Sequence, residues 1–326
     1  MPRPLPRRAV LAGASLPALI GSSRAKAQAW PNKPIRVIVS FPAGGSSDVI
    51  ARLLAPLIGA TLGQPMIVDN RPGAGGMLAG EILKREPADG HTFMLSNAAP
   101  FSISPAQFKR VPYDPIQDFM HVSFLGAGQS AIFVAPSMGV RDVQGFIAKA
   151  KAAPGRIAYG SSGIGSITHI IGEGFAKRAG IELLHVPYRG SAPAIQDFLG
   201  GQIPVFLDSL MLNAPMVRAN QAIPVVLCAA ERAPAFPEVP TMVESGIDLV
   251  AENWLGYSAP AGLPDAIAER FDAAVVAATN DPAVRARMLE LGTVPGRKTR
   301  AGFSAFVTAQ LPVWRQLMLD AGIEPT

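Results

Sequence analysis

Cysteine is almost absent from this chain of 326 residues, which contains only Cys228. A single cysteine excludes an internal disulfide and a CxxC redox motif. The chain also lacks a Gly-Lys-Ser/Thr sequence and an HExxH sequence, which excludes a P-loop and a zincin-type metal site. Because Cys228 ends the apolar run at residues 225–228, we expect a buried small hydrophobe rather than a nucleophile.

Basic residues are concentrated at the N-terminus. Arg3, Arg7 and Arg8 precede an apolar run at residues 9–21, and small residues follow up to Ala27. This pattern predicts a secretory signal over residues 1–27, cleaved near Ala27 and exported by the Sec or the twin-arginine route. The protein is therefore expected in the periplasm.

The rest of the chain carries no charge excess, because residues 1–27 hold five of the 29 basic residues and none of the 24 acidic ones. Near-neutral charge without a basic cluster argues against nucleic-acid binding. No second apolar run approaches the roughly 20 residues that span a bilayer, so we expect a soluble protein. Its length suits two domains of ordinary size.

Strand-like and helical patterns alternate along most of the chain, and helical patterns alone fill the last third. This alternation predicts α/β units around mostly parallel sheets. The expected strands are residues 36–41, 66–70, 92–96, 132–135, 157–160, 183–187, 205–208 and 225–229; the expected helices include residues 142–152, 166–179, 265–279, 282–291 and 299–321.

The most informative turn is FPAGGSSD at residues 41–48, between a β-branched strand and an apolar-periodic helix. Gly44 and Gly45 allow a tight turn and a close approach to a ligand, and either serine or the aspartate after them can cap the helix. Free amides at a helix start favour a carboxylate or a phosphate. The glycine-rich residues 70–80 lack dinucleotide spacing, because Leu78 stands where glycine or alanine is needed.

A second glycine turn, at residues 160–169, offers the hydroxyls of Ser161 and Ser166 but not the G-x-S-x-G order of a nucleophile elbow. His169 and Glu173 lie four residues apart on one helical face. They could form a metal or acid/base pair, but the sequence shows no third ligand at a suitable spacing. We expect a packing pair and no metal.

A third stretch, residues 185–209, combines Tyr188 and Arg189 at a strand end with Asp208 at the end of another strand. Arg189 could meet a carboxylate in bidentate fashion, and ligands bind at the carboxyl ends of strands in open α/β sheets. The sequence thus offers several anion-binding turns and no assembled catalytic constellation. For an exported α/β protein this combination favours binding over chemistry.

The order of these segments resembles the substrate-binding receptors of tripartite tricarboxylate transporters, also called Bug-type receptors. The resemblance covers the chain after the signal. It rests on WPNKPIRVIVSFPAGGSSD (30–48), GQPMIVDNRPGAGGMLAG (63–80), PADGHTFMLS (87–96), YGSSGIGSITHIIGEGF (159–175), HVPYRGSAPAIQDFLGGQI (185–203), PEVPTMVESG (237–246) and WLGYSAPAGLP (254–264).

This resemblance implies the type II periplasmic-binding-protein fold, with two α/β domains, a ligand cleft between them and two crossing segments. The crossings would lie near residues 132–136 and 252–258. Domain one would comprise residues 28–131 plus 256–326, and domain two residues 132–255.

The resemblance also implies which residues bind the ligand, mainly through backbone amides, hydroxyls and waters at the turns. Asp48 or Asp208 could accept an amine or a hydroxyl of the ligand. The implied site consists of Phe41, Gly44, Gly45, Ser46, Asp48, Asn97, Ser161, Ser166, His169, Tyr188 and Asp208.

The expected function is that of a periplasmic receptor that captures a small organic carboxylate by domain closure and delivers it to membrane permease subunits. We expect a monomer without enzyme activity, metal or cofactor. Two alternatives remain open at this stage. One is a ligand-sensing partner of a membrane sensor kinase, and the other is a secreted hydrolase that uses Ser161 or Ser166.

Overall fold

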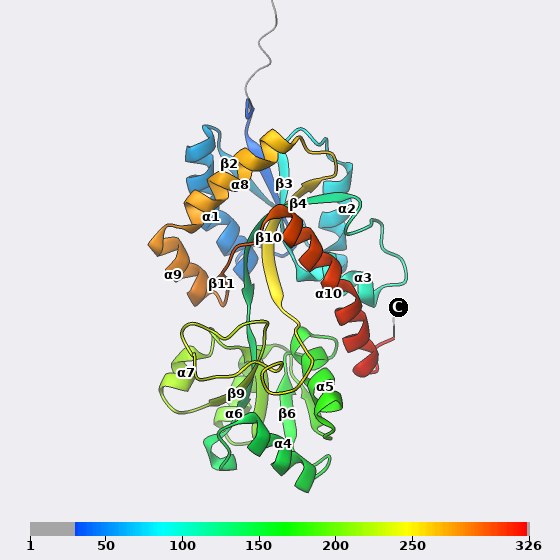
Figure 1. Ribbon diagram of the computed structural model, residues 1–326, viewed down its shortest axis with the longest axis vertical. Coiled ribbons are helices and arrows are strands. Elements are labelled where there is room, and N and C mark those ends of the chain that lie inside the picture. Colours follow the sequence, from blue (N-terminus) through cyan, green and yellow to red (C-terminus); the bar gives the residue numbers. More distant parts are fainter. Residues whose placement is uncertain (1–29, 325–326) are drawn as a thin grey trace, which may run out of the picture.

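The computed structural model describes residues 30–324, so the expected secretory signal at residues 1–27 lies outside the described residues. Two lobes follow one another along the long axis of the molecule, and each is built on one β-sheet with helices packed against it (Figure 1). The chain begins in the first lobe, forms the second lobe and returns to the first for its last third.

The first lobe contains a six-stranded sheet in the order β11-β4-β10-β3-β1-β2. Strand β1 pairs in parallel with β2 and β3, whereas β10 pairs antiparallel with β3 and β4. The strands are β1 (Ile35–Val39), β2 (Met66–Asn70), β3 (Thr92–Asn97), β4 (Phe119–Gly128), β10 (Asn253–Pro260) and β11 (Val294–Pro295).

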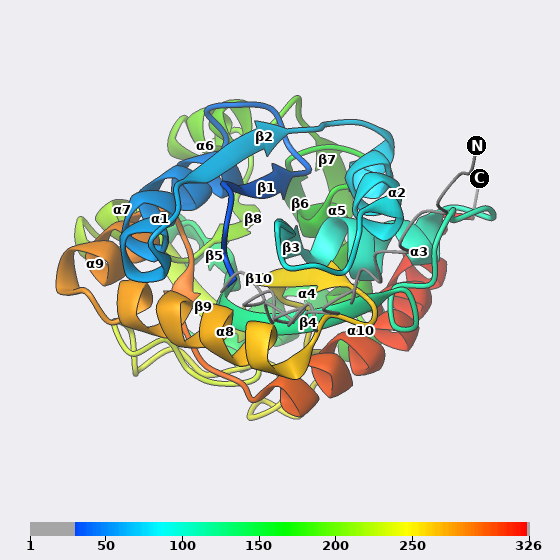
Figure 2. The ribbon, with the colours of Figure 1, turned by 90° about the horizontal axis from the view of Figure 1, so that it is seen from above.

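Helices cover both faces of this sheet, as Figure 2 shows from above. Alternate residues of β1 explain this: Ile35, Val37 and Val39 join the core under α1 and α8, while Ile38 joins the core of the other face. The helices are α1 (Ser46–Leu62), α2 (Met77–Arg85), α3 (Ser104–Gln107), α8 (Asp265–Thr279), α9 (Pro282–Glu290) and α10 (Arg300–Asp320), with short turns η1 (Ala74–Gly76) and η2 (Ala99–Ile103).

The second lobe contains a five-stranded sheet in the order β7-β6-β8-β5-β9. Strand β6 is parallel to β7 and β8, and β5 is antiparallel to β8 and β9. Its elements are β5 (Ser130–Val134), η3 (Pro136–Met138), α4 (Val143–Ala152), β6 (Ala158–Ser161), α5 (Ile167–Ala179), β7 (Leu184–Pro187), α6 (Ser191–Leu199), β8 (Val205–Ser209), α7 (Ala214–Arg218) and β9 (Ile223–Cys228).

Every expected strand and every helix named above is present within a few residues of its predicted bounds. The expectation of mostly parallel sheets is corrected, because β10 and β5 run antiparallel in the middle of their sheets. Strands β4, β10 and the short β11 are not among the expected strands. Cys228 is fully buried, and its sulfur accepts the Ala251 N–H at 3.3 Å, as expected of a small core residue.

The chain passes between the lobes at two points that lie side by side. Gln129 alone separates the end of β4 from the start of β5, and the return occurs where β10 begins at Asn253, which pairs with Gly128. Residues 132–136, where the first crossing was expected, lie in β5 and the turn after it. The sheets therefore meet at the Gly128 end of β4.

Helix α10 adds a third connection between the lobes (Figure 1). It packs on β4 and α3 of the first lobe and on α5 of the second. At its end, Asp320 forms ion pairs with Arg178 at 2.6 Å and with Lys177 at 3.0 Å, both on α5. Gly174 of α5 leaves room there for the Leu317 side chain.

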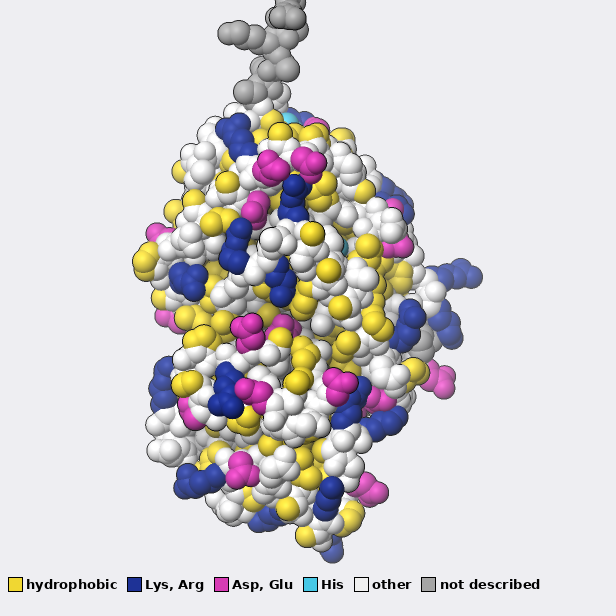
Figure 3. Space-filling view, in the orientation of Figure 1, with side chains coloured by type: hydrophobic (Ala, Val, Ile, Leu, Met, Phe, Trp, Pro, Cys, Tyr) yellow, Lys and Arg dark blue, Asp and Glu magenta, His cyan; other side chains and the backbone are white. Residues whose placement is uncertain are grey.

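The outer surface mixes charges of both signs. On the face shown in Figure 3, Lys and Arg side chains alternate with Asp and Glu side chains over both lobes, without a continuous basic area. Within residues 30–324, no helix is both long enough and apolar enough to cross a bilayer.

Candidate functional site

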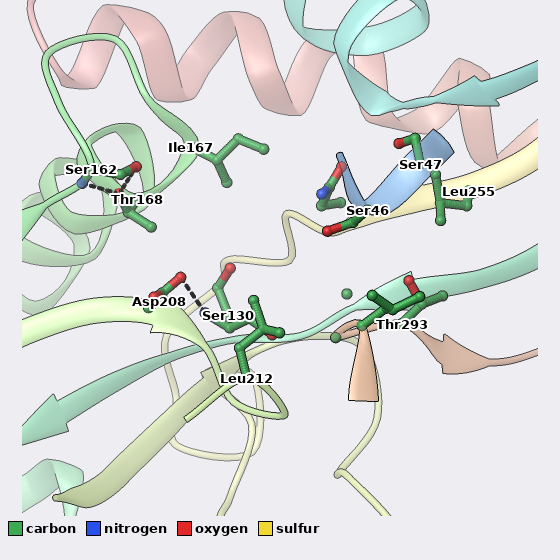
Figure 4. A pocket seen from close by; sticks show the side chains of 15 residues that line it. Ser46, Ser47, Ser130, Ser162, Ile167, Thr168, Asp208, Leu212, Leu255 and Thr293 are labelled. Atoms are coloured by element: carbon green, nitrogen blue, oxygen red, sulfur yellow. Dashed lines mark hydrogen bonds between the residues drawn. The ribbon is translucent and has the colours of Figure 1, made fainter. Parts of the chain in front are cut away.

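A cavity of about 230 Å³ lies between the two lobes. The first lobe contributes the start of α1, the start of β10 and the loop between α9 and β11; the second contributes the ends of β6 and β8 and the start of α5. Figure 4 shows side chains of the two lobes on opposite sides of this space. The lining residues are Ser46, Ser47, Gly128, Ser130, Ser162, Ile167, Thr168, Asp208, Ser209, Leu212, Asn253, Leu255, Leu291, Gly292 and Thr293.

Helix α1 opens onto the cavity with Ser46 and Ser47. Its N-cap, Gly45, has no side chain to offer, and the first bond of the helix runs from the Val49 N–H to the Gly45 carbonyl at 3.0 Å. The amides before Val49 therefore lack an intrahelical partner, and the helix dipole adds positive charge to them. This end of α1 can hold an anionic group without a basic side chain.

The carboxylate of Asp48 lies inside the turn before α1 and does not line the cavity. It is 2 % exposed and accepts hydrogen bonds from the Gly44 N–H and from Asn70 Nδ2, each at 2.9 Å, and it pairs with Arg52 at 3.0 Å. The hydrogen bond from Arg52 outweighs burial and holds the pKa of Asp48 below its ordinary 3.8. Asp48 therefore shapes the turn that presents the helix start.

On the second lobe, the Thr168 hydroxyl organises the turn between β6 and α5. Its oxygen accepts the Ser162 N–H at 2.9 Å and lies 3.0 Å from the hydroxyls of Ser162 and Ser166 (Figure 4). A hydroxyl donates once and accepts twice, so these contacts use the whole capacity of Thr168. Ser166 is the N-cap of α5 and accepts the His169 N–H at 3.2 Å. The turn is thus fixed by its own hydroxyls.

Ser161 and His169 lie beneath this turn. Ser161 is fully buried, with its oxygen 2.7 Å from His185 Nε2. His169 accepts the Gly165 N–H on its Nδ1 at 3.1 Å, and its ring stacks on that of His185 with centroids 4.1 Å apart. Both predicted residues therefore support the turn and do not line the cavity.

His169, Glu173 and His185 place one possible ligand atom each within 4.8 Å of one another. The sequence spacing missed His185 because it lies on a different element, β7. These donor types suit zinc. However, the Gly165 N–H occupies Nδ1 of His169, His185 is hydrogen-bonded as described above, and the Tyr159 hydroxyl donates to Glu173 at 2.6 Å. The cluster is a hydrogen-bonded stack, and we assign no metal to it.

Asp208 is the one ionisable side chain among the described residues that line the cavity. It is 8 % exposed and accepts the Ser209 N–H at 2.8 Å. Burial raises the pKa of Asp208, and hydrogen bonds from Ser209, Asn213 and Ser191 oppose that rise. Its carboxyl group can accept a hydroxyl or an amine of a ligand.

A comparison with known proteins shows which family has this geometry. Residues 50–323 match the family described as tripartite tricarboxylate transporter family receptor (TctC). This chain belongs to that receptor family. Members are binding proteins rather than enzymes.

The similarity of this receptor to its relatives extends over nearly the whole chain. It is 31 % identical to Protein BugT of Bordetella pertussis, with 91 % of each chain covered. It is 30 % identical to R. palustris Rpa4515, solved with adipate, with a TM-score of 0.71 and coverage of 91 % and 100 %. It is 28 % identical to MatC of Rhodopseudomonas palustris, solved with bound malate, with a TM-score of 0.67 and coverage of 88 % and 99 %. The predicted periplasmic-binding-protein fold is confirmed.

In the receptor, Ser161 and His185 are as close together as the serine and histidine of a hydrolase, but they share no other feature with such a pair. Ser161 is fully buried, and its oxygen also accepts the Gly163 N–H at 3.2 Å. The pair therefore holds the turn together, consistent with the non-enzymatic family.

The remaining predicted residues of the receptor lie around the cavity rather than in its lining. Phe41, at the turn before α1, is 38 % exposed, and Gly44 and Gly45 belong to the same turn. Asn97 is buried and donates to Ser40 at 2.9 Å, and the Tyr188 hydroxyl donates to Asp197 at 2.8 Å. Of the predicted set, Ser46 and Asp208 line the cavity. A direct role in ligand binding stays a prediction for every residue of the set.

Sequence reasoning missed several polar residues that line the cavity of the receptor. Ser47 and Ser162 stand inside the turns that the sequence singled out, so their motifs carried a usable signal. Ser130, Asn253 and Thr293 come from the passages between the sheets and the loop before β11, where no motif marks them.

Proposed function

We propose that this protein is a periplasmic receptor that captures a small organic carboxylate between its two lobes and delivers it to membrane permease subunits. The observation that carries this proposal is the uncapped start of α1, which faces a cavity without a basic side chain among its described lining residues. Amides and hydroxyls at such a position favour an anion of modest charge. Adipate and malate, the acids in two related structures, are of this class.

The cavity can hold both parts of such an acid. Ser46 and Ser47 present hydroxyls and amides to a carboxylate, whereas Ile167, Leu212 and Leu255 enclose its carbon skeleton. Because these groups come from both lobes, a ligand that contacts them together favours the closed arrangement. We propose that the closing domains are residues 30–128 with 253–324 and residues 130–252.

A binding panel tests the capture step. Purified mature protein is titrated calorimetrically with acetate, succinate, malate, adipate and citrate, and its thermal unfolding is recorded with each acid. At about 100 times the dissociation constant, a ligand should stabilise the protein by roughly 2.7 kcal/mol. A panel without any saturable binding would contradict the proposal.

A cellular experiment tests the delivery step. Cells that lack the protein should lose uptake of the acid identified by the panel, and the wild-type protein should restore it. Normal uptake together with a lost transcriptional response to the acid would overturn delivery to a permease and support a ligand-sensing partner of a sensor kinase instead.

A further inference from the structure

Three aromatic rings form a stack beneath the turn at residues 163–165. Tyr159 of β6 stacks on His185 of β7 with ring centroids 5.0 Å apart, and His185 stacks on His169 of α5 at 4.1 Å. The Tyr159 hydroxyl donates to Glu173 of α5 at 2.6 Å, which fixes the base of the stack. The stack thus has a defined position relative to the second sheet.

The two imidazoles hold both ends of this turn. At one end, Gly165 donates its N–H to His169 Nδ1 at 3.1 Å. At the other end, Gly163 donates its N–H to the Ser161 hydroxyl at 3.2 Å, and that hydroxyl lies 2.7 Å from His185 Nε2. Both glycines have positive φ, 132° and 75°, so local preference alone does not fix the turn. Ser162 and Thr168, on either side of the turn, line the cavity.

The hydrogen bond from Gly165 requires a neutral His169. A neutral imidazole has one nitrogen that accepts and one that donates, whereas an imidazolium donates from both nitrogens. A proton on Nδ1 of His169 would therefore face the Gly165 N–H and break this bond. A charged His169 would also lie in contact with the second imidazole of the stack.

The surroundings favour the neutral forms. Burial lowers the pKa of His169, and the Glu173 carboxylate opposes this shift; burial, with a smaller effect from His169, lowers the pKa of His185 to about 4. Ionisable groups near His169 are Glu173 on α5 itself, His185 on β7, Tyr159 on β6 and Asp208 on β8. Lys177 and Arg178, two turns further along α5, pair with Asp320 of α10, which also packs on α5.

We propose that His169 is a positioning residue for ligand binding: its neutral Nδ1 holds the turn at residues 163–165 in place, and uptake of a proton by His169 frees the turn and weakens binding. The inference rests on the proposed function, because the turn acts through the cavity between the lobes. Protonation of His169 would then promote release of the ligand without touching any group that lines the cavity.

The decisive variant is His169→Asn, because asparagine Oδ1 can take the place of Nδ1 as acceptor but does not titrate near neutral pH. The affinity for malate and adipate is measured by calorimetry between pH 7.5 and pH 4.5. Wild-type affinity should fall by up to about tenfold for each pH unit below the pKa of His169. The variant should bind like the wild type at neutral pH and lose this part of the pH dependence. Titration of the acid itself and of Asp208 in the cavity affects both proteins equally.

A second readout needs no ligand. The Gly165 amide resonance of wild-type protein is followed by NMR across the same pH range, beside the ring resonances of His169. The amide should shift together with ring titration in the wild type and stay constant in the variant.

The outcomes separate the two proposals. Equal pH dependence of affinity in both proteins, or a Gly165 amide that ignores the titration of His169, would overturn the role of His169. If neither acid binds at neutral pH, malate and adipate are not ligands and the panel above decides the receptor function, while the amide titration still decides whether protonation frees the turn.

Discussion

Asp48 and Asp208 show how far the surroundings of one residue decide its role. Both are buried carboxyls next to βα connections, and the resemblance to the receptor family predicts that either could accept an amine or a hydroxyl of the ligand. Asp48 pairs with Arg52 and accepts hydrogen bonds from the Gly44 N–H and from Asn70 Nδ2, so its charge is used locally. Asp208 has no ion pair among the described residues and faces the cavity. The first residue therefore contributes to stability, and the second is available to a ligand.

Loss of the Asp48 carboxylate should destabilise the fold. Asp48→Ala leaves the Gly44 N–H, Asn70 and Arg52 without their acceptor and should lower the free energy of unfolding by about 2–3 kcal/mol, since hydrogen bonds to a charged group contribute about 1.5–3 kcal/mol. Denaturant unfolding measures this change. Glu290→Gln, which removes the exposed pair with Arg287, serves as control and should stay within about 0.5 kcal/mol.

Acid should remove the contribution of Asp48 to the free energy of unfolding. Its folded-state pKa lies below the ordinary 3.8, so the contribution is complete above pH 3.8 and is lost as the pH falls through the lower folded-state value. The stability difference between wild type and Asp48→Ala should therefore shrink in strong acid. A difference that stays constant down to that range would contradict the assignment.

Two neighbouring glycines offer a matched test of backbone conformation. Gly44 has φ of 86° and open space around it, whereas Gly45 has φ of −72° and an ordinary 3.4 Å contact to Pro42. Gly44→Ala should cost about 1–2 kcal/mol, because an L-residue is strained in that region. Gly45→Ala should be nearly neutral. Equal effects in thermal unfolding would show that φ is not the cause.

At the scale of elements, two variants at the start of α1 can separate the contribution of a backbone amide to ligand binding from that of a side-chain hydroxyl. Ser46 occupies the first helical position, where proline is tolerated, and Gly45 before it is already extended with ψ of 162°. Ser46→Ala removes a hydroxyl alone, and Ser46→Pro removes the amide donor as well. If the amide binds a carboxylate, the proline variant should bind the acid about 10–100 times more weakly than the alanine variant, at equal stability.

The local sequence pattern predicted the strands and helices that have a strong apolar period. It missed strands β4 and β10, whose polar side chains form hydrogen bonds inside the sheet. On β4 and β10, His121 and Ser258 lie 2.9 Å apart, and Ser258 donates to Ser96 at 2.8 Å. These buried polar pairs interrupt the apolar run that would mark a strand. In the same way, Ser46 could be predicted from its turn, whereas Ser130 and Asn253 belong to the site only because the sheets meet there.

At the scale of the whole molecule, α10 ties the two lobes together beside the two chain passages. Its last residue, Asp320, has a side chain only 3 % exposed between Arg178 and Lys177 of α5. Burial acts to raise the pKa of Asp320, but bonds from Gln316, Lys177 and Arg178 outweigh it and hold the pKa below 3.8. The contact between α10 and α5 therefore stabilises the fold at neutral pH, and this contribution is lost in strong acid.

Asp320→Asn should lower the free energy of unfolding by about 1–3 kcal/mol at neutral pH, because it removes the charge that pairs with both cations of α5. The difference from wild type should diminish as the pH falls below 3.8. Asp272→Asn, which affects the pair with Arg297 within the first lobe, is the control and should change stability by less than about 1 kcal/mol. A similar loss in both variants would argue against a special role for the contact between lobes.

The place of β10 determines the order in which the lobes can be completed after the chain leaves the ribosome. It separates β3 from β4 in the first sheet, although it follows both of them by more than a whole lobe of sequence. The second sheet has all its strands once Cys228 is available, whereas β4 has no paired neighbour until Asn253–Pro260 arrive. Contacts between distant segments form slowly, because the intervening chain must first be ordered. We therefore expect the lobe that begins the chain to be the last to finish folding, because its sheet stays incomplete until about three quarters of the polypeptide is available.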